Sequence, residues 1–302
     1  MHARARAPEF TSFHADRPAG AREAHPNANL VPSSYMRMLD LLYRSARLTH
    51  PGAACTLLTD PATRVAGIRG NVRRFDQPID HTALMLSRSR AQRAYVEMSP
   101  FERPIVLLDS DILLNGSLQG LFDTDFDVGL TWRASRTMPI NGGLIVLNNR
   151  RPEVARTFVR RFVELYERVH TTDTNASWYG DQLALRDVVG LTHEEMKGRD
   201  VVERDGCRIA LLPCDVYNFS PDNELAAIQD GLPTKVVLHF KGQRKQLMDP
   251  FWSTFLQWRE SFWPWAARRG RRALRELQAR IAAENAAAAR SATAKPAAKA
   301  NA

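Results

Sequence analysis

Two aspartates separated by one residue follow a short apolar segment of the chain. Residues 105–108 read Ile-Val-Leu-Leu after a proline, which predicts a buried strand, and Asp109-Ser110-Asp111 comes directly after it. Side chains alternate across a strand, so Asp109 and Asp111 point the same way if the extended backbone continues. Their charges repel each other, and a hard cation such as Mn²⁺ or Mg²⁺ resolves the conflict. The alternative interpretation is a solvated turn.

A histidine, a glycine and a lysine at intervals of three residues follow a second apolar segment. Residues 236–238 predict a strand that ends at His239, and Gly242 and Lys245 come after it. A histidine at a strand end can complete a metal site with two aspartates. A glycine lets the backbone approach phosphates closely, and a lysine supplies a point charge for a phosphate oxygen. A capped strand with basic surface residues is the alternative, but the combination with Asp-x-Asp favours a site.

These segments and three others occur in the order found in a known family. The chain resembles the nucleotide-sugar glycosyltransferases of the GT-A fold, and most closely the retaining, galactosyltransferase-like family 8. The resemblance covers roughly residues 30 to 250. The motifs that carry it are residues 105–113 (IVLLDSDIL), 139–148 (PINGGLIVLN), 180–182 (GDQ), 212–219 (LPCDVYNF) and 239–245 (HFKGQRK).

The resemblance implies a set of site residues. Asp109, Asp111 and His239 would bind Mn²⁺ or Mg²⁺, and Asp181 and Gln182, at an expected helix start, would be catalytic. The implied substrate-binding residues are Arg93, Ser110, Asn141, Gly142, Gly242 and Lys245.

Several of these residues also have ordinary structural explanations. Arg90 could serve in place of Arg93, and either could be a solvated arginine. Asn141 and Gly142 could form a hairpin turn, and Asp181 could simply cap its helix. The pair at 217–218 (Tyr-Asn) is a secondary candidate, explained equally well by packing and a turn.

The implied activity is metal-dependent transfer of a hexosyl group from a nucleotide diphospho-sugar, with a UDP-sugar as the first expectation. The resemblance implies retention of configuration and a saccharide or lipid-linked acceptor. The cation and Lys245 would neutralise the leaving diphosphate, and Asp181 would stabilise positive charge on the sugar. Two alternatives are a phosphohydrolase of the haloacid dehalogenase type, with Asp181 and Asp187 as its later acidic motif, and a non-catalytic sugar-nucleotide-binding protein.

Composition and periodicity predict a single α/β domain with a mostly parallel sheet flanked by helices. We expect a disordered N-terminus at 1–9, the GT-A domain at 10–250, an aromatic and basic helical segment at 251–285 and a disordered tail at 286–302. Strands are expected at 10–14 and 55–58, and helices at 33–48, 82–98, 152–170 and 181–189.

The basic charge of the chain is concentrated near its C-terminus. Of the net charge of +9, +7 falls in residues 259–302, so the body has no basic stripe for nucleic acid. Four of the six tryptophans (Trp252, Trp258, Trp263 and Trp265) precede a basic cluster of five arginines at 268–275. Such a segment suits an anionic membrane surface, although the tryptophans could instead pack on the domain. With no secretory signal, membrane span or cysteine framework, we expect a cytoplasmic protein with peripheral contact at the inner face of the plasma membrane.

Overall fold

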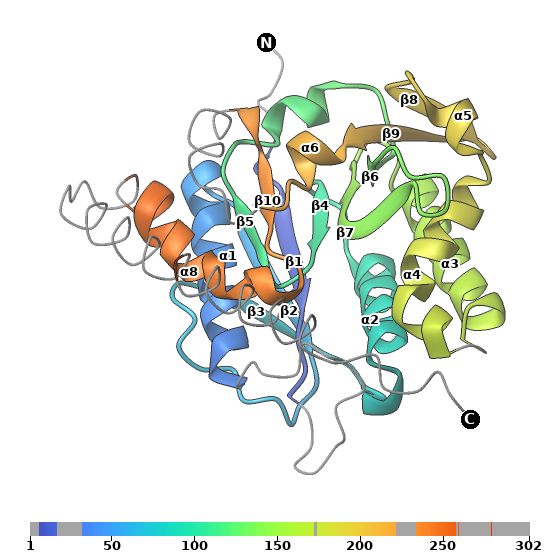
Figure 1. The fold of residues 1–302 in the computed structure, drawn as a ribbon. Helices are drawn as coiled ribbons and strands as arrows, with labels where there is room; N and C mark the ends of the chain where they lie inside the picture. Colours follow the sequence, from blue (N-terminus) through green and yellow to red (C-terminus); the bar gives the residue numbers. More distant parts are fainter. Residues whose placement is uncertain are drawn as a thin grey trace, which may run out of the picture.

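The core of the protein is a mixed eight-stranded sheet with the order β3-β2-β1-β4-β7-β6-β9-β8 (Figure 1). The computed structural model describes residues 6–16, 32–171, 174–221, 234–257, 259 and 279. All strands run in one direction except β7 and β8, which are antiparallel to their neighbours. The strands are β1 (Glu9–Phe13), β2 (Ala54–Thr59), β3 (Arg73–Asp76), β4 (Ile105–Leu108), β6 (Val128–Trp132), β7 (Ile140–Leu147), β8 (Val201–Arg204) and β9 (Cys207–Pro213).

Because six strands are co-directional, their carboxyl ends lie at one edge of the sheet. The five of these strands that bear on the site are β1, β2, β4, β6 and β9. Open α/β sheets bind ligands at such an edge. The residues that directly follow these five strands there are His14, Asp60, Asp109, Arg133 and Cys214. The first residues of β7 reach the same edge from the opposite direction.

Helices cover both faces of the sheet, as Figure 1 shows. One face packs against α2 (Leu84–Met98), α3 (Pro152–Val169) and α4 (Thr174–Val189), and the other against α1 (Pro32–Thr49) and α8 (Met248–Phe251). The four residues of strand β4 are all apolar because the strand is buried on both faces. Ile105 and Leu107 pack in the α2–α3–α4 layer, whereas Val106 and Leu108 pack in the α1 layer.

A second, two-stranded sheet lies in the α1 layer. It pairs β5 (Ile112–Leu114) with β10 (Val237–His239) in antiparallel register, with His239 opposite Ile112. The short elements that complete the described chain are η1 (His81–Ala83), η2 (Gln119–Asp123), α5 (His193–Met196), α6 (Cys214–Tyr217), η4 (Gly242–Leu247) and the π-helix η5 (Trp252–Leu256).

The expected fold class is confirmed, and most elements lie where the sequence predicts them. Two local predictions are wrong. The helix expected to start at Asp181 begins at Thr174, because Gly180 is a packing residue and not a breaker. A Cβ at Gly180 would lie 2.2 Å from Cε2 of Tyr166, so glycine lets α4 approach α3. The resemblance also implies that the motif at 212–219 is a strand that ends in Tyr217-Asn218, but the strand ends at Pro213, where the chain turns into α6.

The described part of the C-terminal segment packs on the domain. Trp252 is fully buried, and the Arg44 guanidinium lies 4.5 Å from its ring, so for this tryptophan the alternative of packing on the domain is the one observed. Trp258, Trp263, Trp265 and the basic cluster after them lie outside the described residues, as does the tail at 286–302 that was expected to be disordered. Of the N-terminal segment at 1–9 that was expected to be disordered, residues 1–5 lie outside the described residues, and Glu9 begins β1. No described helix is both long enough and apolar enough to cross a bilayer.

Candidate active site

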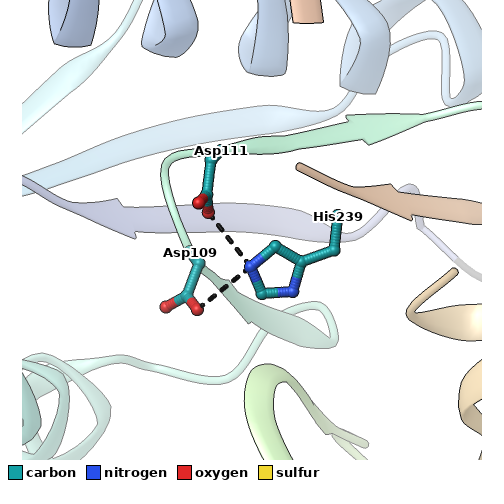
Figure 2. Close-up of side chains that lie close together, drawn as sticks. All are labelled: Asp109, Asp111 and His239. Atoms are coloured by element: carbon teal, nitrogen blue, oxygen red, sulfur yellow. Dashed lines mark ion pairs between the residues drawn. The ribbon is translucent and has the colours of Figure 1, made fainter. Parts of the chain in front are cut away.

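Asp109, Asp111 and His239 come together at the edge where the strands end. Nε2 of His239 lies 3.1 Å from Oδ1 of Asp111 and 3.5 Å from Oδ2 of Asp109, and Figure 2 shows the ring edge facing both carboxylates. One ligand atom from each residue lies within 4.8 Å of the other two. Two carboxylate oxygens and an imidazole nitrogen form a donor set suited to a divalent cation.

Backbone hydrogen bonds fix the two aspartates. Asp109 directly follows β4, and its N–H donates to the carbonyl of Gly143 on β7 over 3.0 Å. Asp111 begins the turn into β5, and its carbonyl accepts from the N–H of Phe240 over 2.8 Å. The half-buried Ser110 forms the turn between the two aspartates.

A chain of buried amides orients the His239 ring. Nδ2 of Asn218 donates to Oγ1 of Thr131 over 3.0 Å and to Oδ1 of Asn141 over 2.5 Å, so Oδ1 of Asn218 must face the ring. That oxygen lies 2.7 Å from Nδ1 of His239, which therefore carries the proton. Nε2 is then the nitrogen that faces the aspartates.

The same chain continues to the expected catalytic pair. Oδ1 of Asn141 also accepts from the N–H of Gly143 over 3.0 Å, and Nδ2 of Asn141 donates to Oε1 of Gln182 over 3.0 Å. One series of hydrogen bonds, with consistent amide orientations, thus runs from His239 through Asn218 and Asn141 to Gln182. This series links the group formed by Asp109, Asp111 and His239 to α4.

Arg88 bridges Asp109 and Asp181. The buried guanidinium donates from Nη1 to Oδ1 of Asp109 and from Nη2 to Oδ2 of Asp181, the latter over 2.6 Å. Burial raises the pKa of Asp181, the Asp109 charge adds to this, and Arg88 opposes it. Among the described residues, neither Oδ1 of Asp181 nor Nε of Arg88 has a hydrogen-bond partner, although both atoms are buried.

Positive charge from η4 reaches the aspartates. Nζ of Lys245 lies 3.4 Å from Oδ2 of Asp111 and 5.7 Å from the centre of the Tyr35 ring. Burial would raise the pKa of Asp111, but His239 and then Lys245 outweigh this and lower that pKa well below its usual value. Gly242 opens η4 with φ of +59°, a backbone conformation that favours glycine.

Two adjacent glycines on β7 let this cluster close. A Cβ at Gly142 would lie 2.6 Å from Oδ2 of Asp181, and one at Gly143 would lie 2.4 Å from Cε1 of His239. The strand therefore passes against both functional side chains with no room for a methyl group.

Solved structures similar to this chain were found, although no family model and no curated protein sequence matches it. The crystal structure of the glycosyltransferase GlyE from Streptococcus pneumoniae TIGR4 matches with a TM-score of 0.50 and 15% identity over 90% of this chain and 63% of that one. The chain has the GT-A glycosyltransferase fold. It spans less than two thirds of the length of GlyE.

Two other matches to this GT-A fold have lower scores. A glycosyltransferase involved in glycosylation of the major capsid of PBCV-1 has a TM-score of 0.46 and 13% identity over 80% of this chain and 98% of that one. The galactosyltransferase LgtC, solved with donor and acceptor sugar analogs, has a TM-score of 0.42 and 14% identity over 78% of this chain and 87% of that one.

Within the GT-A fold, the structure brings together most of the residues singled out in the sequence. The exception is Arg93, whose Nε lies 3.1 Å from Glu97 and whose Nη1 lies 3.9 Å from Glu164, away from the cluster. Arg90 likewise pairs with Glu167 over 2.7 Å. The prediction that Arg93 serves the site is therefore corrected to Arg88.

Helical periodicity could have identified Arg88. It shares the buried side of α2 with Gln92 and Tyr95, at spacings of four and seven residues. Arg93 is five residues further along, about 140° around the helix from Arg88. Asn218 was only a secondary candidate, from the motif at 212–219, and periodicity could not show its importance, which comes from contacts with Thr131 and His239, both distant in sequence.

Proposed function

We propose that the protein is a metal-dependent glycosyltransferase that moves a hexosyl group from a nucleotide diphospho-sugar, with UDP-sugars as the first donors to test. The observation that carries this proposal is the cluster of Asp109, Asp111 and His239, joined through Arg88 to the buried carboxylate of Asp181. This arrangement places a cation site and a carboxylate on the ligand-binding edge of a GT-A fold.

The donor set supports a divalent cation, Mn²⁺ or Mg²⁺. His239 presents Nε2 to the two aspartates because Asn218 binds Nδ1, so three ligand atoms converge on one point. A cation held there would supply Lewis-acid stabilisation to the leaving nucleoside diphosphate. Lys245, 3.4 Å from Asp111, adds a fixed positive charge on the same side.

The nucleotide would lie on the β1 side of the cluster. His14 follows β1 and stacks on Tyr35 with ring centroids 5.2 Å apart, and Tyr35 lies beside Lys245. An aromatic surface next to a phosphate-binding lysine is the chemistry that a nucleoside diphosphate requires.

Asp181 and Gln182 would act on the sugar. Arg88 keeps one oxygen of Asp181 engaged, while the other is buried without a described partner. That second oxygen is available to stabilise developing positive charge at the anomeric carbon. Asn141 holds Oε1 of Gln182, which leaves the Gln182 amide nitrogen to donate to a sugar oxygen. Retention of configuration, implied by the family 8 resemblance, is part of the proposal.

The deciding experiment separates this activity from its alternatives. Purified protein is incubated with UDP- and GDP-sugars in Mn²⁺ or in EDTA, and nucleoside diphosphate release and ligand-induced thermal shifts are measured. We expect cation-dependent release from at least one donor. Binding without release would indicate a non-catalytic sugar-nucleotide protein, and an absence of both would contradict the proposal. The phosphohydrolase alternative lacks support, because Asp181 lies inside helix α4 and not at a strand end.

We also propose that the acceptor is a saccharide or a lipid-linked saccharide of the envelope, reached at the inner face of the plasma membrane. The support is the net charge of +7 in residues 259–302. Each basic residue near an anionic surface contributes about 1 kcal/mol. Co-sedimentation with anionic liposomes should fall at high salt and on deletion of residues 267–302. Binding that ignores the deletion would contradict this proposal without affecting the glycosyltransferase assignment.

A further inference from the structure

Asp109, Asp111 and His239 divide the ligand-binding edge of the sheet into two sides. Each side contains one lysine, and both lysines come from residues 241–245. Lys245 lies beside Tyr35, which stacks on the residue after β1. Lys241 lies towards Arg133 and Cys214, which follow β6 and β9. Lys241 comes two residues after His239, and Arg133 comes two residues after Thr131, and Asn218 joins His239 to Thr131 by hydrogen bonds of 2.7 and 3.0 Å. In the sheet order, β1 and the β6–β9 pair lie on opposite sides of β4 and Asp109.

Arg133 and Cys214 leave the sheet from neighbouring strands. Trp132 and Pro213 are the last pair of the parallel β6–β9 ladder, and Arg133 and Cys214 are the residues that directly follow them. Nε of Arg133 donates to the carbonyl of Met138 over 2.8 Å, which fixes the guanidinium at the strand end. Lys241 follows β10 and is half-buried, and it interacts electrostatically with Asp109 and Asp111 as well as with Arg133.

Within the described residues, neither Lys241 nor Arg133 forms an ion pair that would balance its positive charge. In the part of the chain that the structure describes, neither side chain has a carboxylate within 4.0 Å, whereas Arg88 and Lys245 each do. Two neighbouring cations repel each other, and a bound anion would remove that cost while gaining charge-assisted hydrogen bonds. The nucleotide phosphates are met by Lys245 on the other side of the cluster, so this anion belongs to another substrate.

We propose that the acceptor carries a carboxylate or phosphate group and that Arg133 and Lys241 bind it. This inference rests on the proposed glycosyltransferase function, and it narrows the acceptor from any saccharide to an acidic one. An acceptor held on the β6–β9 side would meet the donor sugar near Asn141 and Gln182, which lie between that side and the metal cluster.

Binding of matched ligands tests the proposal without requiring turnover. Saturation-transfer NMR titrations compare methyl β-glucoside with methyl β-glucuronide, which supplies a carboxylate, and with glucose 6-phosphate, which supplies a phosphate. They are run in Mg²⁺ with and without UDP, because UDP occupies the donor phosphate site. We expect at least one anionic ligand to bind about tenfold more tightly than the neutral one. The carboxylate and phosphate arms identify which anion is preferred.

Substitutions then assign the preference to its residues. Lys241→Gln and Arg133→Gln should each move the ratio of anionic to neutral affinity towards one. Lys197→Gln, which changes an exposed lysine, should leave that ratio unchanged. Lys245→Gln should weaken UDP binding and leave the ratio unchanged.

Two results would overturn the inference: equal or absent binding of the anionic ligands to the wild type, or a preference that survives both substitutions. Either result leaves the donor assay of the proposed function untouched. An absence of UDP binding, in contrast, would contradict the proposed function itself.

Discussion

Nδ1 of His239 lies 2.7 Å from Oδ1 of Asn218, on the side of the ring away from the two aspartates. Asn218 therefore decides which imidazole nitrogen faces Asp109 and Asp111. A metal-ligating histidine depends on such a partner for its tautomer and its orientation.

Substitutions at Asn218 should separate its two roles. Asn218→Leu removes the acceptor for Nδ1–H, and we expect it to raise the Mn²⁺ concentration needed for half-maximal binding by about 10- to 100-fold. Asn218→Asp keeps that acceptor but loses the donors to Asn141 and Thr131, so its Mn²⁺ affinity should stay closer to wild type. Calorimetric Mn²⁺ titration measures both variants. Equal, unchanged affinities would mean that Asn218 has no influence on the metal site.

Loss of the Asp111 carboxylate should abolish the activity and its cation dependence. Asp111→Asn keeps the shape of the side chain but removes the charge that faces His239 and Lys245, so nucleoside diphosphate release should fall by at least about 100-fold. Asp123→Asn changes an exposed aspartate and serves as the control. Full turnover by Asp111→Asn in EDTA would exclude Asp111 as a metal ligand.

A single methyl group on β7 should disrupt the cluster. In Gly143→Ala the new Cβ would lie 2.4 Å from Cε1 and 2.6 Å from Nδ1 of His239, a distance that forces the ring or the strand to move. We expect loss of metal binding and a lower Tm. Gly120→Ala is the matched control, because nothing lies within 4 Å of its added Cβ. Metal affinity that is equal in the two variants would contradict the close approach of β7 to His239.

Stability should depend on pH through His50, which is far from the active site. Burial lowers the pKa of His50 to about 4, and its Nε2 accepts from the N–H of Leu118 over 2.8 Å. Between pH 4 and the ordinary histidine pKa of 6.5, the unfolded chain binds the proton that the folded protein refuses. The free energy of unfolding should therefore decrease as the pH falls through this window, by up to about 3 kcal/mol.

Urea unfolding at a series of pH values measures this slope. In His50→Gln the contribution should be absent, and the slope between pH 6.5 and pH 4 should be shallower than in the wild type. His14 also has a pKa lowered by burial, so part of the slope should remain. An identical slope in the variant would show that His50 is accessible to protons in the folded state.

Local sequence patterns were sufficient to predict the elements that carry Asp109, Asp111 and His239. The apolar runs before Asp109 and before His239 are fully buried strands, so each delivers its polar residue to the sheet edge. The motif around Asn141 also lies where the resemblance implied, next to Gln182.

The remaining parts of the site depend on contacts between distant segments, which periodicity does not report. Arg88 is distinguished from Arg93 only by its direction on α2, and 93 residues separate it from Asp181. The start of α4 before Asp181 was not predicted, because the Tyr166 ring that packs on Gly180 comes from another helix. In both cases tertiary packing overrides local propensity.

The turn at Ser110 is where the chain leaves the large sheet and enters the small one. Asp109 belongs to the eight-stranded sheet, whereas Asp111 and His239 are held by the β5–β10 pair. Separation of this three-residue ladder from the main sheet would dismantle the cation site while the rest of the protein stayed folded. A cation held by these three residues would therefore link its own binding to the protection of the β5 and β10 amides from hydrogen exchange, and it would act as a clamp between two layers of the fold.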